Sequence, residues 1–175
     1  MRRFRRLRTS TEMRRMVRET DLDKKDFIYP LFVAEGRGIK NPIESMPEMY
    51  QYSIDMLDEP LSLIYDSGIS RILIFGIPAH KDDKASSAYD DNGVTQNAVR
   101  YIKEKLPNLI VIADICLCEY TSHGHCGVVC NGEILNDETL PLLAKMAVSM
   151  AKAGGRHRCT LGYDGRSSGC YKNSS

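Results

Sequence analysis

The stretch Leu109-Ile-Val-Ile-Ala-Asp-Ile115 is a run of aliphatic residues with one carboxylic acid near its end. A short apolar run that is continuous in Leu, Ile and Val is typical of a parallel strand buried on both faces. Two other short apolar runs precede it along the chain, at residues 27–33 and 71–77. We therefore predict three strands of one parallel sheet.

Segments with apolar residues at helical spacing separate and follow these runs. They span residues 55–67 and 95–105, and a third segment begins at Asn136. Pro60 lies inside the first segment and weakens the prediction for its first half, because proline cannot donate a backbone hydrogen bond. The alternation of strands and helices indicates an α/β fold in which right-handed crossovers join parallel strands.

Three cysteines follow directly on the third predicted strand. Cys116 and Cys118 lie two residues apart, so their side chains share a face if the strand stays extended to its end. Gly124 and small polar residues between Cys118 and Cys126 allow the chain to turn and to bring in a third sulfur. Thiolates suit zinc, and three protein ligands leave one tetrahedral position open, as in catalytic zinc sites.

Two other interpretations of the six cysteines have to be weighed. They could form disulfides or serve as small buried hydrophobic residues. A disulfide framework is disfavoured, because the N-terminus is rich in arginine and has no apolar segment of the signal-peptide type. The spacing favours metal binding over inert cysteines, but it does not say which metal-dependent reaction follows.

The segment Asp114-Ile-Cys-Leu-Cys-Glu-Tyr-Thr-Ser-His-Gly-His-Cys-Gly127 closely resembles the zinc-site signature of porphobilinogen synthase, also called delta-aminolevulinic acid dehydratase. Five other stretches resemble the same family in the same order: Arg5-Arg-Leu-Arg8, Arg14-Arg-Met-Val-Arg-Glu-Thr20, Phe27-Ile-Tyr-Pro-Leu-Phe-Val33, Leu73-Ile-Phe-Gly-Ile-Pro78 and Asn136-Asp-Glu-Thr-Leu140. The segment Ser45-Met-Pro-Glu-Met-Tyr-Gln51 departs from the pattern, since the family usually has glycine after the proline and arginine three residues later. We expect that loop to be altered locally.

The resemblance implies an eight-stranded TIM barrel, in which catalytic groups stand at the C-terminal ends of the strands. By this comparison the chain holds about the first three strand–helix units and forms an incomplete TIM (β/α)8 barrel with an N-terminal arm. We expect a basic arm over residues 1–24, a partial TIM-barrel domain over 25–154 and a disordered, non-family tail over 155–175.

The tail after Gly154 is poor in aliphatic residues, with Leu161 and no isoleucine or valine. We therefore expect no buried fourth strand from it, and its composition is typical of a disordered segment. A DNA that encodes Cys159-Thr-Leu-Gly-Tyr-Asp-Gly-Arg166 can, read from the second base of each codon, also encode Ala-Pro-Ser-Asp-Met-Met-Asp-Gly. That second sequence resembles what the family carries at this point. We interpret the tail as the product of a frameshift near Gly155, either a real mutation or a sequencing error.

The arginine-rich arm contrasts with the rest of the chain. Residues 1–20 carry eight arginines against two glutamates, while the net charge of the whole chain is +1. Such an arm could bind nucleic acid or act as a transit peptide, but it holds little aromatic content and no nucleic-acid motif follows. No apolar run approaches the length of a membrane span, so we expect neither a nucleic-acid nor a membrane partner. In the family that the chain resembles, the arm embraces a neighbouring subunit of a homo-octamer. We expect subunit contact here and a cytoplasmic location.

The family condenses two 5-aminolevulinate molecules to porphobilinogen, with loss of water, on the route to haem and other tetrapyrroles. The resemblance implies that Cys116, Cys118 and Cys126 hold Zn²⁺. It also makes Asp114 a candidate for assisting proton transfer, although a carboxylate at a strand end can instead bind backbone or solvent. His125 is a candidate for orienting a thiolate from outside the ligand set.

The family holds its substrates as Schiff bases on two lysines, and none of the ten lysines of this chain matches them. Lys81 and Lys84 lie in a polar loop, where a solvated lysine is the ordinary interpretation. We therefore expect a porphobilinogen synthase by descent that is inactive alone. The alternative is a non-catalytic zinc-binding remnant that associates with intact subunits. An unrelated metal-binding or redox module is disfavoured, because the family's motifs match along most of the chain.

Overall fold

The computed structural model of the chain describes residues 5–154 and 157–159. Its strands are β1 (Tyr29–Ala34), β2 (Lys40–Pro42), β3 (Tyr50–Tyr52), β4 (Arg71–Ile77), β5 (Ile110–Asp114), β6 (Val129–Cys130), β7 (Glu133–Ile134) and β8 (His157–Cys159). Its α-helices are α1 (Thr11–Met16), α2 (Asp58–Asp66), α3 (Val94–Lys105) and α4 (Asn136–Lys152). Four short 3₁₀ helices among the described residues are η1 (Arg6–Arg8), η2 (Lys24–Asp26), η3 (Ile54–Met56) and η4 (Ser86–Ala88).

The main sheet has the strand order β2-β3-β1-β4-β5-β8. β1, β4, β5 and β8 run parallel and in chain order, with Leu73 aligned between Pro30 of β1 and Ile112 of β5. In the chain, α2 lies between β1 and β4, α3 between β4 and β5, and α4 between β5 and β8. The predicted mixed α/β fold with a parallel sheet is confirmed.

The predicted boundaries are close to the observed ones where the apolar pattern is strong. The strand predicted at 71–77 is β4, and the helix predicted from residue 95 begins one residue earlier. The segment 55–67 divides into η3 and α2, and Pro60 lies in the first turn of α2. Proline is tolerated there, because a backbone N–H in the first turn has no intrahelical acceptor to lose. The sequence reasoning missed β2 and β3, which form an antiparallel pair beside β1.

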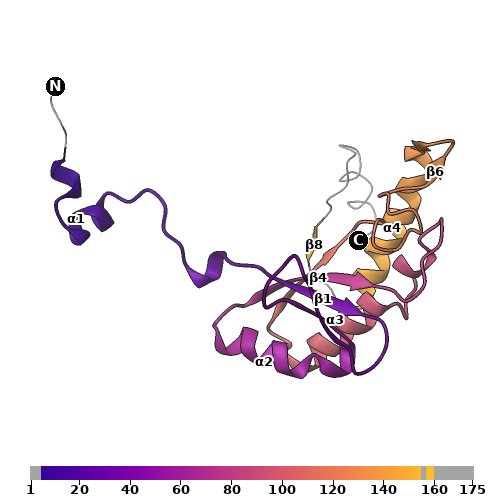
Figure 1. The fold of residues 1–175 in the computed structure, drawn as a ribbon, viewed down its shortest axis with the longest axis horizontal. Helices are drawn as coiled ribbons and strands as arrows, with labels where there is room; N and C mark the ends of the chain where they lie inside the picture. Colours follow the sequence, from indigo (N-terminus) through magenta and orange to yellow (C-terminus); the bar gives the residue numbers. More distant parts are fainter. Residues whose placement is uncertain (1–4, 155–156, 160–175) are drawn as a thin grey trace.

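Helices cover one face of the sheet (Figure 1). Apolar side chains of β1, β4 and β5 pack there against Leu61 and Ile64 of α2 and against Val99 and Ile102 of α3. Burying each of these large aliphatic side chains contributes about 1.5–3 kcal/mol to folding. A second core lies between the residues that follow β5 and α4, where Tyr120 packs in the same cluster as Met146 and Met150.

The other face of the sheet is less covered by the described residues. Along β4 the buried residues Ile72 and Ile74 alternate with the half-buried Leu73 and Phe75. Phe75 stacks on Phe32 of β1, with ring centroids 5.1 Å apart. The sequence predicted strands buried on both faces, and the second face is indeed apolar, but it stays partly open within residues 5–154 and 157–159.

A short fourth parallel strand, β8, lies within the tail that we expected to be disordered. β8 pairs with β5 so that His157 aligns with Ile112 and Cys159 with Asp114. Backbone hydrogen bonding to an open strand edge does not require aliphatic side chains, so the aliphatic-poor composition did not exclude a strand here. The remainder of the predicted tail, 155–156 and 160–175, lies outside the described residues.

The basic arm extends away from the sheet and helices. Figure 1 shows it as the indigo segment at the left, with α1 near its outer end. Ser10 caps α1 by accepting a hydrogen bond from the Met13 backbone N–H, yet neither η1 nor α1 contains a buried residue. The described arm therefore gains almost nothing from packing within its own chain.

The loop that departs from the family pattern holds a residue in the left-handed region. Glu48, where the family usually has glycine, has a φ of 66°. Its turn is closed by hydrogen bonds from the Met46 N–H to the Ile43 carbonyl and from the Met49 N–H to the Met46 carbonyl. A residue with a Cβ is strained at this φ, whereas glycine is not.

Replacing Glu48 by glycine should therefore stabilise the chain. Relief of the left-handed strain is offset in part by the flexibility of glycine in the unfolded state, which leaves a gain of roughly 0.5–1 kcal/mol. Glu44→Gly is the matched control, because Glu44 is an exposed glutamate of the same loop without a positive φ. The free energy of unfolding, measured in urea by circular dichroism, should be higher for Glu48→Gly than for the unaltered chain. It should be lower for Glu44→Gly. The reverse ranking would contradict the strain at Glu48.

Candidate metal centre

Three thiols meet just beyond the C-terminal end of β5. The sulfur atoms of Cys116, Cys118 and Cys126 all lie within 4.8 Å of one another, and the first two are 3.2 Å apart. All three cysteines are free thiols. The structure thus brings together the three cysteines that the sequence singled out as ligands.

Local geometry explains how a strand end and a loop supply these sulfurs. The chain stays buried through Ile115 and Leu117, so Cys116 and Cys118 alternate with apolar residues that enter the core. Backbone N–H groups of Tyr120 and Thr121 then donate to the Leu117 carbonyl and begin a turn. Gly124, with a φ of 75°, helps the loop to reverse before Cys126.

Cys116 and Cys118 are poorly hydrated. Desolvation raises the pKa of Cys116 far above its ordinary value and raises the pKa of Cys118 as well. A bound divalent cation has the opposite effect, since a coordinating thiol loses its proton outright. Three sulfurs within ligand reach of one point, each free and at least partly buried, form a donor set that fits zinc.

Two carboxyl groups lie beside the thiols. Asp114 is only 6% exposed, and its Oδ1 atom has no hydrogen-bond partner among the described residues. Burial raises its pKa to about 6. Glu119 was missed by the sequence reasoning, because a single glutamate carries no spacing signal. Burial, and after it the charge of Asp114, raises the pKa of Glu119 to about 7.

His123, His125 and Cys130 are close to the three thiols in the sequence. His125 is exposed, its backbone N–H donates to the Nδ1 atom of His123, and the two rings lie 5.4 Å apart. The orienting role expected of His125 stays a prediction. Cys130 is exposed in β6, outside the group of three thiols. Asn131 and Gly132, both with positive φ, make the tight turn that joins β6 to β7.

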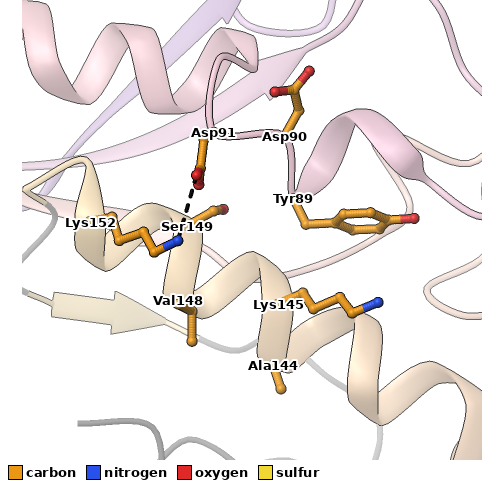
Figure 2. Close-up of a pocket in the computed structure, with 8 residues that line it drawn as sticks. All are labelled: Tyr89, Asp90, Asp91, Ala144, Lys145, Val148, Ser149 and Lys152. Atoms are coloured by element: carbon orange, nitrogen blue, oxygen red, sulfur yellow. Dashed lines mark ion pairs between the residues drawn. The ribbon is translucent and has the colours of Figure 1, made fainter.

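A separate cavity of about 580 Å³ lies between α4 and the loop that precedes α3 (Figure 2). Lys152 pairs there with Asp91 at 3.5 Å, and the Lys145 ammonium lies 5.7 Å from the centre of the Tyr89 ring. The charged ends of Lys152 and Asp91 meet across the cavity in Figure 2. The cavity contains none of the sulfur ligands.

The buried carboxyl of Asp114 should make the metal-free chain less stable as the pH rises. Its folded pKa of about 6 lies above the ordinary value of 3.8, so the folded state holds the proton more tightly than the unfolded state. The stabilisation that this carboxyl contributes to the folded state is therefore complete below about pH 4 and is lost as the pH rises to about 6. The free energy of unfolding is measured in urea across this pH range with a chelator present. Asp114→Asn should reduce its fall with pH, whereas Asp66→Asn, at an exposed position, is the control and should not. An unchanged fall in the Asp114→Asn chain would contradict the assignment.

Comparisons with known proteins identify the family of the chain. The family model described as delta-aminolevulinic acid dehydratase matches residues 1–159, which include the first five residues of the tail expected at 155–175. The chain is 53% identical over 152 residues to delta-aminolevulinic acid dehydratase of Halalkalibacterium halodurans, covering 87% of this chain and 46% of that protein. The corresponding protein of Bacillus subtilis is also 53% identical over 152 residues, with 87% and 47% covered.

One solved structure is similar over nearly the whole chain. It is delta-aminolevulinic acid dehydratase (porphobilinogen synthase) from Toxoplasma gondii ME49, in complex with the reaction product porphobilinogen. The TM-score is 0.94 at 30% sequence identity, and the match covers 99% of this chain and 50% of the other. The chain thus spans about half the length of the curated relatives it matches. With a family match over nine tenths of its residues, the chain belongs to the delta-aminolevulinic acid dehydratase family.

Proposed function

We propose that the chain is part of a porphobilinogen synthase, which condenses two 5-aminolevulinate molecules to porphobilinogen with loss of water. The observation that carries this proposal is the group of three free thiols at the end of β5, within the family match. TIM-barrel enzymes use the C-terminal ends of their strands for catalysis, and Asp114 is the last residue of β5. The site therefore lies where the fold positions chemistry.

Cys116, Cys118 and Cys126 are the proposed ligands of Zn²⁺. When bound, the ion supplies Lewis acidity and an acidified water at its fourth position. The Oδ1 atom of Asp114 is buried without a partner, and a pKa of about 6 lets this carboxyl hold or release a proton near neutral pH. We assign it proton transfer at the substrate. His125 is proposed to orient a thiolate from outside the ligand set.

The sheet is proposed to be the first part of an eight-stranded barrel. Its strands β1, β4, β5 and β8 are parallel and follow one another in chain order, as barrel strands do, and the face that carries Phe32 and Phe75 is apolar but partly open. Further strands would bury that face. The relatives are about twice as long as the matched segment, which supports the same proposal.

The lysines that form Schiff bases are proposed to lie in the part of the relatives that this chain does not match. Lys81 and Lys84 are both exposed in the loop before α3, as expected of solvated lysines. A chain without those lysines cannot hold two substrates in register, so the 175-residue polypeptide is proposed to be inactive alone.

One observation favours the second candidate, a zinc-binding remnant that docks onto intact subunits. The arm carries six arginines over residues 5–18, and neither η1 nor α1 has a buried residue. An exposed arm of this kind can contact a neighbouring subunit.

The homo-octamer and the cytoplasmic location stay predictions under both candidates. The DNA sequence around codon 155 separates the two candidates.

The metal assignment predicts a specific spectroscopic result. Cobalt replaces zinc in thiolate sites and gives a charge-transfer absorbance, so the unaltered chain should show this band at about one cobalt per chain. Cys118→Ala should lose most of it, while Cys130→Ala should keep it, because Cys130 is exposed outside the group. Equal spectra for Cys118→Ala and the unaltered chain would refute the ligand set.

The activity assignment predicts a gain on restoring the reading frame. The 175-residue chain should make no detectable porphobilinogen from 5-aminolevulinate. A chain continued in the shifted frame from codon 155 should show zinc-dependent synthesis and should be labelled by borohydride in the presence of substrate. Turnover by the 175-residue chain would show that catalysis does not need the further strands. A folded, zinc-loaded and inactive restored chain would count against the proposed function.

A further inference from the structure

A buried phenol anchors the loop that carries two of the three thiols. Tyr120 is 1% exposed, and its hydroxyl lies 2.7 Å from the Oγ1 atom of Thr95, which is equally buried. Tyr120 follows Cys118 by two positions and precedes Cys126 by six, whereas Thr95 belongs to the first turn of α3. The hydrogen bond therefore links the loop directly to a helix that is packed on the sheet.

The backbone of β4 is shaped to admit this pair. A Cβ atom at Gly76 would lie 1.8 Å from Thr95 Oγ1 and 2.7 Å from the Tyr120 hydroxyl, distances that no packed side chain tolerates. The φ of Gly76 is not positive, so the space, and not the backbone conformation, requires glycine here. The two hydroxyls thus occupy the position that a side chain of β4 would otherwise fill.

The same loop is tied a second time through its backbone. The Asp82 N–H donates to the Tyr120 carbonyl at 3.3 Å, and the Ser122 N–H donates to the Asp82 carbonyl at 3.1 Å. Thr121 Oγ1 donates to the His125 carbonyl at 2.8 Å, which closes the loop just before Cys126. The first two bonds hold the loop against the β4–α3 connection, and the Tyr120 side chain packs in the core beside α4.

We propose that Tyr120 and Thr95 are positioning residues for the metal centre, whose hydrogen bond fixes the loop so that Cys118 and Cys126 reach Cys116. The inference rests on the proposed zinc site and deepens it. Three thiolates repel one another, so a site for them has to be held together by the surrounding structure before the cation arrives. A buried phenol has one favourable place for its hydroxyl, since an unpaired hydroxyl in an apolar core is costly.

Removal of either hydroxyl should weaken metal binding with the fold intact. Outer groups that orient metal ligands typically contribute 10–100-fold to affinity, so we expect Tyr120→Phe and Thr95→Val each to lose about tenfold in zinc affinity. Thr95→Ser keeps the hydroxyl and should restore most of the binding. The double variant should lose little more than either single one, because both substitutions break the same bond.

The experiment uses the 175-residue chain. Zinc affinity is measured by competition with a chromophoric chelator, and the geometry of the thiolate site by the ligand-field bands of bound cobalt. Tyr101→Phe is the matched control, because the Tyr101 hydroxyl donates to Asp58 at 2.7 Å, on α2 and away from the thiols. This control should keep the affinity and cobalt bands of the unaltered chain.

Three results would overturn this inference and leave the zinc proposal standing. The first is unchanged zinc affinity and cobalt bands in Tyr120→Phe, and the second is a less stable Tyr120→Phe chain with unchanged zinc affinity. The third is a loss of zinc affinity in the double variant that equals the sum of the two single losses. If Tyr120→Phe does not fold, the comparison of Thr95→Val with Thr95→Ser decides in its place, and equal affinities for these two would overturn the inference. Absence of thiolate–cobalt bands in the unaltered chain would overturn the zinc proposal itself, and this inference with it.

Discussion

Parallel pairing of β5 with its neighbours fixes the position of every group in the candidate centre. β4 lies on one side of β5 and pairs with it up to Ala113, and β8 lies on the other side and pairs with it up to Asp114. The chain then runs directly into Cys116 and Cys118, while the end of β4 leads into the loop that contains Asp82. Because the C-terminal ends of parallel strands share one edge of a sheet, the cysteine loop and the β4–α3 connection lie side by side.

The centre combines burial with charge, and this combination sets its chemistry. Apolar residues on both sides of Cys116 belong to the core under α4, so the Cys116 thiol and the Asp114 carboxyl lose much of their hydration. Desolvation penalises the charged forms of Asp114, Cys116 and Cys118 and raises their pKa values. Protons or a cation have to compensate for the lost hydration. A site that holds three thiols and a carboxyl with a raised pKa is therefore suited to a divalent metal and to proton transfer near neutral pH.

Polar contacts inside the two cores hold the helices in one arrangement. Tyr120 and Thr95 join the cysteine loop to α3, and Gln96 Nε2 donates to Ser149 Oγ, which joins α3 to α4. Apolar packing alone tolerates small shifts, whereas a buried hydroxyl or amide has to meet its partner or leave a polar group unpaired. The helices around the centre are thereby fixed relative to the strands that carry it.

The sequence by itself determined the strand and helix segments at 71–77, 95–105 and from Asn136, and it determined that three thiols gather at one strand end. These features depend on local periodicity and on spacings of a few residues, and both can be seen directly in the amino-acid sequence. The resemblance to a family followed from the same local segments. The unusual Glu48 was visible as a departure from that family, but only its φ of 66° showed what the departure costs.

Tertiary structure decided the rest. The pairing of β3 with β1 and of β8 with β5 depends on backbone contacts between distant segments, which carry no periodic signal in the chain. The contact between Tyr120 and Thr95 spans 25 positions, and Glu119 joined the site through burial rather than through spacing. The pKa values of Asp114 and Glu119 follow from their desolvation, and desolvation exists only once the sheet, α4 and the cysteine loop have packed together.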